Sequence, residues 1–304
     1  MADIIEVTGL NKRYGEVEAV RGIDFTVEAG NLFAFLGPNG AGKSTTIDIL
    51  CTLLKPDAGE VIIDGHLLGK EDAAIRQQIG VVFQNGLLDQ LLTVEENLTT
   101  RGSFYGLTSV KLKQAVTFAS ETSGVTEYFK RPYGKLSGGQ KRRSDIARAL
   151  VHMPKILFLD EPTTGLDPQT RKSVWSTIRK LQRESGMTVF LTTHYMEEAA
   201  TADQVCVIDK GVITAQGTPG ELREKYSRDR LLMYTEDPQP LLDALDAVGA
   251  HGHVRGGRVS VTLNKTTEAI PLINACQPYF DVFEVVLGSM DDAFIAIIGK
   301  EDGQ

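Results

Sequence analysis

The chain has 304 residues, of which 42% are hydrophobic and 24% are charged, and its formal net charge is -8 at pH 7. This composition is that of a globular protein with room for one large or two smaller cores. The acidic balance argues against nucleic acid as a partner, because nucleic-acid-binding chains favour a basic face. The cysteines, Cys51, Cys206 and Cys276, are odd in number and far apart. They predict buried free thiols rather than disulfides or a metal site.

The N-terminal part of the chain is predicted to form two short strands, Ile4–Val7 and Phe25–Val27, with a turn at Asn11–Gly15 between them. Residues 1–12 lack the layout of a signal peptide, and no apolar run approaches the roughly 18 residues needed to cross a bilayer. We therefore expect the protein itself to be soluble. Tyr14 lies at the predicted turn, where its ring either packs ordinarily or offers a flat face to adenine.

The next stretch is predicted to be a buried strand, Phe33–Leu36, that runs into a glycine-rich turn and then a helix. The turn fits G-x-x-x-x-G-K-[ST], the phosphate-binding loop. Its residues are Gly37, Pro38, Asn39, Gly40, Ala41, Gly42, Lys43, Ser44 and Thr45. The glycines let successive N–H groups point inward, and the start of the helix adds its positive dipole end. Lys43 supplies a charge for the β- and γ-phosphates and Ser44 a hydroxyl ligand for Mg²⁺, so the stretch predicts a nucleoside triphosphate site.

A further strand is predicted at Ile79–Gln84. At its end, Gln84 either points at Mg²⁺ or water in the phosphate site or is an ordinary loop residue. Residues 93–129 are predicted to be helical, with Thr93 and Glu96 spaced as a capping box.

A second candidate anion site follows at Ser137, Gly138, Gly139 and Gln140, which precede a helix to Val151. A serine and two glycines at a helix start bind anions by the same physics as the first loop. The absence of a lysine in this segment favours an accessory phosphate clamp, although such a segment alone is often only a capped turn.

Three polar groups are predicted at the ends of buried strands. The apolar run Ile156–Leu159 does not alternate, which predicts a strand of a parallel sheet that ends in Asp160 and Glu161. Consecutive residues at a strand end point in different directions, so Asp160 can face Mg²⁺ while Glu161 faces a water molecule. The strand Thr188–Thr193 ends at His194, which should lie at the same carboxyl edge of the sheet, where ligands bind.

In this order, the motifs closely resemble those of the nucleotide-binding subunits of ATP-binding cassette (ABC) transporters. The resemblance covers roughly residues 3–220 and depends on GPNGAGKST, LSGGQ, ILFLDEP and GLD together with Gln84 and His194. It implies the ABC-type fold of a P-loop NTPase, an α/β protein with a mixed sheet core at 1–220 and a helical subdomain at about 88–150. It also implies an ATPase that uses ATP and Mg²⁺.

The resemblance implies a role for each residue of the motifs. Tyr14 resembles the aromatic residue that stacks on adenine, and residues 37–45 hold the phosphates. Ser44 and Gln84 contact Mg²⁺, and Asp160 fixes the metal. Glu161 resembles the general base, His194 the residue that touches the γ-phosphate, and Gln84 is counted with these two as catalytic.

The resemblance also implies partners. In such proteins the segment Ser137–Gln140 binds the γ-phosphate held by the opposite subunit, and Asp167 belongs to a loop that faces the other subunit. The active unit is then a head-to-tail pair, here most simply a homodimer. It would drive an integral-membrane permease subunit from the cytoplasmic face of the membrane, with a groove beside Gln84 as the contact.

One departure concerns the subfamily. The family often has LSGGQ-x-Q-R where this chain has Arg142, and LSGGQKRRSDIARAL with LTTHYMEEA is similar to exporter ATPases of the daunorubicin-resistance type. The transported substrate is then a drug, an antibiotic or a lipid-like molecule. An importer ATPase shares all of this chemistry and stays open as an alternative. A soluble ABC ATPase that acts on ribosomes or DNA is the other alternative, although this chain has one cassette and no coiled-coil insert.

The last part of the chain, residues 221–304, is predicted to be a small α+β domain. After a linker helix that ends at Tyr226, the pattern β-α-β-β-α-β plus a helix indicates a ferredoxin-like layer, with a tight turn at Gly256–Gly257. The segment Gly288–Phe294 is similar to the L-E-D-x-F tail of drug-exporter ATPases. We expect a regulatory or dimer-stabilising role for this accessory domain.

Overall fold

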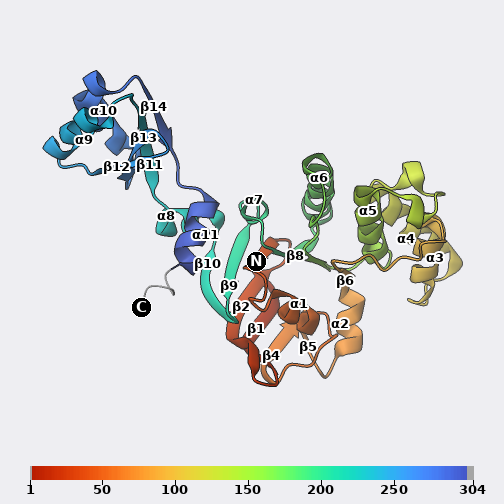
Figure 1. The fold of residues 1–304 in the computed structure, drawn as a ribbon. Coiled ribbons are helices and arrows are strands. Elements are labelled where there is room, and N and C mark those ends of the chain that lie inside the picture. Colours follow the sequence, from red (N-terminus) through yellow and green to blue (C-terminus); the bar gives the residue numbers. More distant parts are fainter. Residues whose placement is uncertain (1, 300–304) are drawn as a thin grey trace. The chain divides into compact units, whose positions relative to one another are not determined.

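The computed structural model describes residues 2–299 of the chain. The chain divides into two compact units, of which the first ends at Gln216 and the second begins at Gly217. Each unit has its own core of buried apolar side chains, and most elements of both are labelled in Figure 1.

A six-stranded sheet forms the centre of the first unit, with the strand order β10-β9-β3-β8-β7-β6. Its strands are β3 (Leu32–Leu36), β6 (Ile79–Val82), β7 (Ile156–Asp160), β8 (Thr188–Thr193), β9 (Gln204–Asp209) and β10 (Val212–Gly217). All pairs along the row β9-β3-β8-β7-β6 are parallel. The prediction of a parallel sheet from continuous apolar runs is confirmed, since every residue of β3 and β8 is buried. The carboxyl ends of β3, β6, β7 and β8 therefore meet at one edge.

Aromatic rings hold these strands in register. Phe33 and Phe190 stack with their ring centroids 5.1 Å apart, and Phe158 lies 5.3 Å from Phe190. The helices of this part are α1 (Lys43–Leu50), α2 (Asp72–Gln78), α6 (Pro168–Ser185) and α7 (Met196–Ala199). Helix α1 follows β3 directly and buries Ile47 and Leu50 in the same core. A well-packed core fixes the positions of the strand ends that carry polar residues.

A second, antiparallel sheet has the order β2-β1-β4-β5. Its strands are β1 (Asp3–Tyr14), β2 (Val17–Glu28), β4 (Ala58–Ile63) and β5 (His66–Leu67). The predicted turn at Asn11–Gly15 is wrong, because Asn11 pairs with Arg21 and Tyr14 with Val17, so both strands are longer. Register shifts interrupt this pairing. They disturb the alternation of apolar and polar residues by which a strand is identified from sequence.

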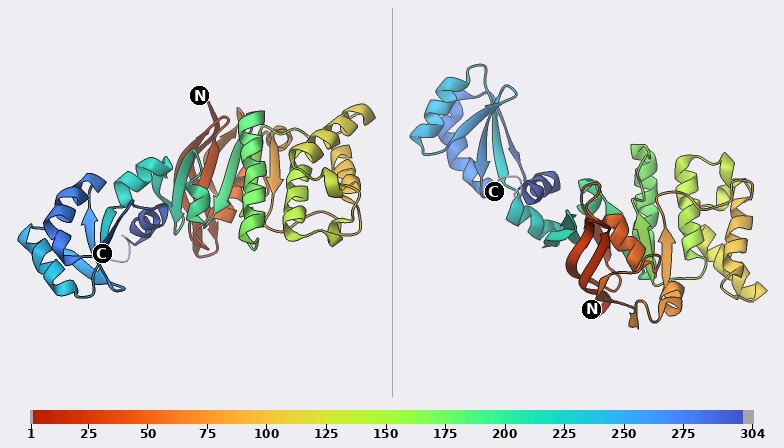
Figure 2. Two further views of the ribbon diagram at one scale, coloured as in Figure 1. Left: turned by 90° about the horizontal axis from the view of Figure 1, so that it is seen from above. Right: turned by 60° about the horizontal axis from the view of Figure 1, so that its bottom comes forward.

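Helices α3 (Val94–Ser103), α4 (Ser109–Thr122) and α5 (Gly138–Leu150) form a helical part that packs beside α6 (Figure 2). The capping box of Thr93 and Glu96 is confirmed. The prediction that residues 93–129 are helical throughout is wrong, since a loop separates α3 from α4. Gly106 has a φ of 67° there, and Thr108 caps α4. Glycine and an N-cap residue together end one helix and start another.

The second unit contains an antiparallel sheet with the order β12-β13-β11-β14. Its elements are α8 (Pro219–Tyr226), β11 (Asp229–Tyr234), α9 (Pro238–Ala247), β12 (Gly252–Arg255), β13 (Arg258–Leu263), α10 (Ala269–Cys276), β14 (Val282–Val286) and α11 (Met290–Ile298). The predicted order of strands and helices is the observed one. The linker helix instead packs within this unit, because α8 contacts α11 and buries Leu222.

Candidate active site

A pocket of about 540 Å³ opens at the carboxyl edge of the central sheet. It is lined by Ala19, Asn39, Gly40, Gly42, Lys43, Ser44, Thr45, Gln84, Glu161, Thr164 and His194. All of these except Ala19 and Thr164 are residues that the sequence marked as site candidates. The structure therefore brings together residues that lie far apart in the chain, from Asn39 in the glycine-rich loop to His194 after β8.

The loop between β3 and α1 takes its shape from glycine. Gly40 and Gly42 have φ values of 82° and 107°, a conformation that side chains with a Cβ rarely adopt. A Cβ atom at Gly42 would lie 2.4 Å from the carbonyl oxygen of Ala19. Gly42 caps α1 without a side-chain hydrogen bond, so the first N–H groups of that helix stay available to an anion.

Lys43 is a buried cation that lies folded back on this loop. Its Nζ donates hydrogen bonds to the carbonyl oxygens of Gly37 (2.8 Å) and Pro38 (3.0 Å) and lies 3.8 Å from Oε1 of Glu161. Burial lowers the pKa of Lys43, while the charges of Glu161 and Asp160 oppose that shift. Its ammonium group is thus held at the pocket by two neutral carbonyls and one carboxylate, and an anion in the pocket could replace the two carbonyls.

The two carboxylates at the end of β7 point to different partners, as predicted. Asp160 Oδ1 accepts a hydrogen bond of 2.5 Å from Thr192 Oγ1, and Asp160 is not among the residues that line the pocket. Burial raises the pKa of Asp160, and the hydrogen bond from Thr192 acts against this rise. The carboxylate of Glu161 faces the pocket, with Oε1 3.2 Å from Nδ1 of His194.

The second oxygen of Glu161 also has partners. Oε2 accepts a hydrogen bond of 3.1 Å from Thr164 Oγ1 and lies 3.5 Å from Nε2 of Gln84. The carboxylate is therefore held by groups from β6, β7 and β8 at once. A carboxylate in such a frame is positioned to take a proton from a water molecule in the pocket.

Several predicted residues lie outside this pocket. Gly37, Pro38 and Ala41 belong to the same loop but do not line the pocket. Tyr14 ends β1, is 49% exposed and has Lys12 Nζ 5.7 Å from its ring centroid. Tyr14 is thus not part of the wall of this pocket.

The second candidate anion site is also separate from the pocket. Ser137 is the N-cap of α5 and forms a capping box with Gln140, and Asp167 caps α6 through the N–H groups of Gln169 and Thr170. None of the four residues 137–140 lines the pocket. One chain therefore presents the loop that contains Lys43 and, apart from it, the segment Ser137–Gln140, which itself contains no lysine.

Comparison with known proteins identifies the family. A sequence model described as ABC transporter matches residues 20–164. The chain is 38% identical over 305 aligned positions to the daunorubicin/doxorubicin resistance ATP-binding protein DrrA of Streptomyces peucetius, with 97% of this chain and 92% of that protein covered. The chain belongs to the ABC transporter family.

Further relatives and solved structures agree with this assignment. The ABC ATPase is 41% identical to the linearmycin resistance ATP-binding protein LnrL of Bacillus subtilis, over 76% of this chain and 75% of that protein. It matches the structure of cbiO1 from Clostridium perfringens with a TM-score of 0.69 and 32% identity, over 73% of this chain and 91% of that one. A dimeric cassette, MJ0796 bound to ADP and Pi, matches with a TM-score of 0.63 and 28% identity, over 70% of this chain and 98% of that one. The resemblance to daunorubicin-resistance ATPases is confirmed, and the chain is an ATPase that binds ATP.

The site of this ABC ATPase includes residues that sequence reasoning missed. Thr164 and Thr192 hold Glu161 and Asp160, and Arg142 donates to backbone carbonyls at the ends of β6 and β7. The signal for the threonines is their position, since Thr192 lies near the end of β8 and Thr164 lies three residues after Glu161. Arg142 stands out in the sequence only as a departure from the family pattern.

A helix must be both long and apolar to cross a bilayer, and none of the helices formed by residues 2–299 combines the two properties.

Proposed function

We propose that this ABC ATPase is the motor subunit of an exporter for a drug, an antibiotic or a lipid-like molecule. Two copies would close head to tail on two ATP molecules, and closure and reopening would drive a separate membrane permease from the cytoplasmic face. The observation that carries the proposal is the convergence of Lys43, Gln84, Glu161 and His194 on one pocket. The relatives named for drug resistance support the cargo class, as does the Nod factor export ATP-binding protein I of Burkholderia lata, which is 41% identical over 83% of both chains.

The residues that would bind the nucleotide follow from the pocket. The N–H groups of residues 37–45 would hold the phosphates, and Lys43 would turn from its loop carbonyls to the β- and γ-phosphates. Tyr14 would stack on the adenine ring from the end of β1. Because the lysine only exchanges neutral carbonyl partners for charged phosphates, ATP binding needs no large rearrangement of this loop.

Mg²⁺ would be held by Ser44, Gln84 and Asp160. The donor set fits this ion, because a hydroxyl, an amide and a carboxylate supply the hard oxygen ligands that Mg²⁺ prefers. Ser44 and Gln84 line the pocket, and only Oδ1 of Asp160 is bonded by Thr192. Bound there, the ion would neutralise charge that develops on the phosphates.

Glu161 would act as the general base for the attacking water. His194 would orient the carboxylate of Glu161, since Nδ1–H of His194 donates towards Oε1 of Glu161 while the ring lines the pocket. Gln84 would place the water or the metal from the end of β6. Thr164 completes the frame by fixing the second carboxylate oxygen.

The segment Ser137–Gln140 would complete the pocket of the opposite subunit, and Asp167 would lie close to the same contact. The helix N-terminus at Ser137 offers N–H groups that lack partners within the helix. Its separation from the pocket of its own chain is what a site shared by two subunits needs.

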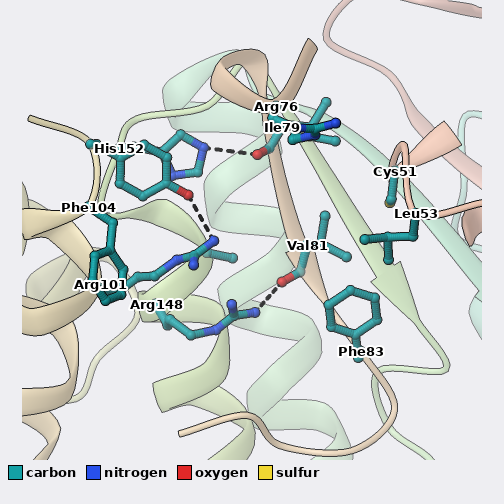
Figure 3. Close-up of a pocket in the computed structure, with 12 residues that line it drawn as sticks. Cys51, Leu53, Arg76, Ile79, Val81, Phe83, Arg101, Phe104, Arg148 and His152 are labelled. Atoms are coloured by element: carbon teal, nitrogen blue, oxygen red, sulfur yellow. Dashed lines mark hydrogen bonds between the residues drawn. The ribbon is translucent and has the colours of Figure 1, made fainter. Parts of the chain in front are cut away.

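The permease would dock at a smaller pocket of about 280 Å³ beside Gln84. Phe83, directly before Gln84, lines it together with Leu53 and Phe104, which are 61% and 72% exposed (Figure 3). Figure 3 also shows Arg101 and Arg148 in its wall. A cytoplasmic helix with apolar residues and an acidic side chain would complement this surface.

The test is the substitution Glu161→Gln. It should lower kcat for ATP hydrolysis at least ~10²-fold, because the amide cannot accept the water proton, while Mg-ATP still binds. Turnover and equilibrium nucleotide binding are measured on the same preparation. Glu197→Gln is the matched control, since Glu197 is an exposed glutamate on α7 outside the pocket. Near-native turnover of the Glu161→Gln protein would contradict the assignment of the base.

A further inference from the structure

Arg142 is a buried arginine whose hydrogen-bond partners are backbone carbonyls at the ends of two strands. It lies on α5, two residues after Gln140, and is 7% exposed. Its Nε donates to the carbonyl oxygen of Pro162 (2.6 Å) and Nη1 to that of Phe83 (2.5 Å). Its Nη2 donates to the carbonyl oxygens of Asp160 (2.9 Å) and Glu161 (3.0 Å). One side chain thus ties helix α5 to the segments that follow β6 and β7.

The backbone that Arg142 grips is strained. Glu161 has a φ of 44°, in the left-handed region that non-glycine residues seldom occupy. The next residue is Pro162, and a proline further disfavours compact conformations of the residue before it. Such a conformation persists only where the surroundings hold it, at a cost of about 1–3 kcal/mol in general.

Hydrogen bonds to the N–H group of Glu161 and to the carbonyl groups around it hold the backbone in this conformation. Its N–H donates to Thr192, with the carbonyl oxygen at 3.2 Å and Oγ1 at 3.1 Å. Its carbonyl and those of its two neighbours, Asp160 and Pro162, accept from Arg142. The direction of the Glu161 carboxylate towards His194 therefore depends on the guanidinium group.

We infer that Arg142 is a positioning residue that sets the geometry of the general base from helix α5, at whose start lie the residues 137–140, here called the signature segment. This inference rests on the proposed function, in which Glu161 is the base and the start of α5 binds the nucleotide of the other subunit. When Ser137–Gln140 engages that nucleotide, the shift of α5 reaches the backbone of Glu161 through Arg142.

Arginine is the side chain that this arrangement requires. A guanidinium group carries five N–H donors in a rigid plane, whereas a glutamine amide has two on one nitrogen and a lysine ammonium is a single point. Gln is the residue that the family pattern often has here, so the change Arg142→Gln removes the extra links without adding bulk. Arg143 is a matched control, because its guanidinium packs over the ring of Tyr128, 5.6 Å from the centroid.

The test is a double-mutant cycle on the full-length protein with Arg142→Gln, Glu161→Gln and the combined variant. Arg142→Gln should lower kcat about 10- to 100-fold through misplacement of the base, with the Kd for Mg-ATP within about threefold of the native value. In the Glu161→Gln background the same change should alter the residual turnover less than about twofold, because residues that act as a unit are not additive. Arg143→Gln should keep native kcat.

Each alternative outcome has a defined meaning. Native kcat in Arg142→Gln, or an equal fold loss in both backgrounds, would overturn the inference, as would loss of Mg-ATP binding in step with turnover. If the Arg142→Gln protein does not fold, Arg142→Lys replaces it and should give an intermediate kcat, whereas native kcat would again overturn the inference. Native turnover in Glu161→Gln itself would contradict the proposed function instead, so the two failures are distinguishable.

Discussion

At the scale of single residues, the contact between His194 and Glu161 orients two polar side chains of the pocket. Nδ1 of His194 lies 3.2 Å from Oε1 of Glu161, and its ring packs 4.0 Å from the ring of Tyr195 between centroids. With a carboxylate as its partner, Nδ1 is the donor, so Nε2 is left for another group. The ring is therefore oriented from two sides before any ligand arrives.

We expect His194→Ala to lower kcat about 10²-fold, because Glu161 loses one orienting partner and the γ-phosphate a contact. The Kd for Mg-ATP should change much less, since the loop and Lys43 are untouched. Steady-state turnover and equilibrium binding are the measurements. His251→Ala is the control, as this histidine is exposed and lies in the second unit. A turnover within twofold of native in His194→Ala would remove His194 from the mechanism.

The residues that sequence could predict are those whose chemistry is tied to a local pattern. The phosphate loop, the acidic pair and His194 each follow a buried strand, so parallel topology alone brings them to one edge. Thr164, Thr192 and Arg142 could not be assigned this way. Their partners are backbone groups or carboxylates 3 to 59 residues away, and only the folded chain reveals that contact.

At the scale of elements, helix boundaries show the same division. The predicted helix start at Ser137 is the observed start of α5, where Ser137 and Gln140 form a local capping box. The loop between α3 and α4 is not predicted. The composition of the whole stretch favours a helix, and only Gly106 and Thr108 interrupt it. Helix capping is local and can be predicted from sequence. Whether a stretch forms one long helix or two shorter ones depends on packing against neighbours such as α5.

The residue His152, just after α5, gives the first unit a pH-dependent stability. Its Nε2 lies 2.9 Å from the carbonyl oxygen of Ile79, and its ring stacks on Tyr105 with centroids 4.2 Å apart. Nδ1 is buried and unpartnered. Burial lowers the pKa of His152 to about 4; the hydrogen bond to Ile79 opposes this, and the charges of Arg101 and Arg148 add to it.

Because the folded pKa lies below the ordinary value of about 6.5, the unfolded chain binds the proton more readily. The stability that neutral His152 contributes to the folded state is thus fully present above pH 6.5 and is lost as the pH falls towards 4. We expect the Tm of His152→Gln to fall less than the native Tm over this window, measured by thermal unfolding at closely spaced pH values. His253→Gln should keep the native slope, since His253 is exposed on β12 in the second unit. Equal slopes for native protein and His152→Gln would refute this.

At the scale of the whole molecule, the two candidate anion sites of one chain do not line the same pocket. The pocket with Lys43 opens at the carboxyl edge of the sheet, and Ser137–Gln140 does not line it. A helix N-terminus binds phosphate weakly without a cation beside it, whereas it adds much to a pocket that already has one. Two copies related by a twofold axis can each supply what the other lacks.

Mixing two inactive variants tests this arrangement. Lys43→Ala disables the loop and Ser137→Arg blocks the signature segment, so each protein alone should have little ATPase activity. In a mixed pair, the loop of the Ser137→Arg subunit meets the intact signature segment of the Lys43→Ala subunit, which restores one of two sites. With random pairing at equal amounts, half of the pairs are mixed, so we expect recovery of up to about a quarter of native turnover.

The control places both substitutions in one chain and mixes it with native protein. Here each mixed pair has one site with a disabled loop and the other with a blocked signature segment, so activity should only fall with dilution. If each chain instead hydrolysed ATP with its own two segments, mixing the single variants would restore nothing, because every chain would carry one defect. Turnover that rises on mixing the single variants and falls in the control can come only from sites built by two subunits.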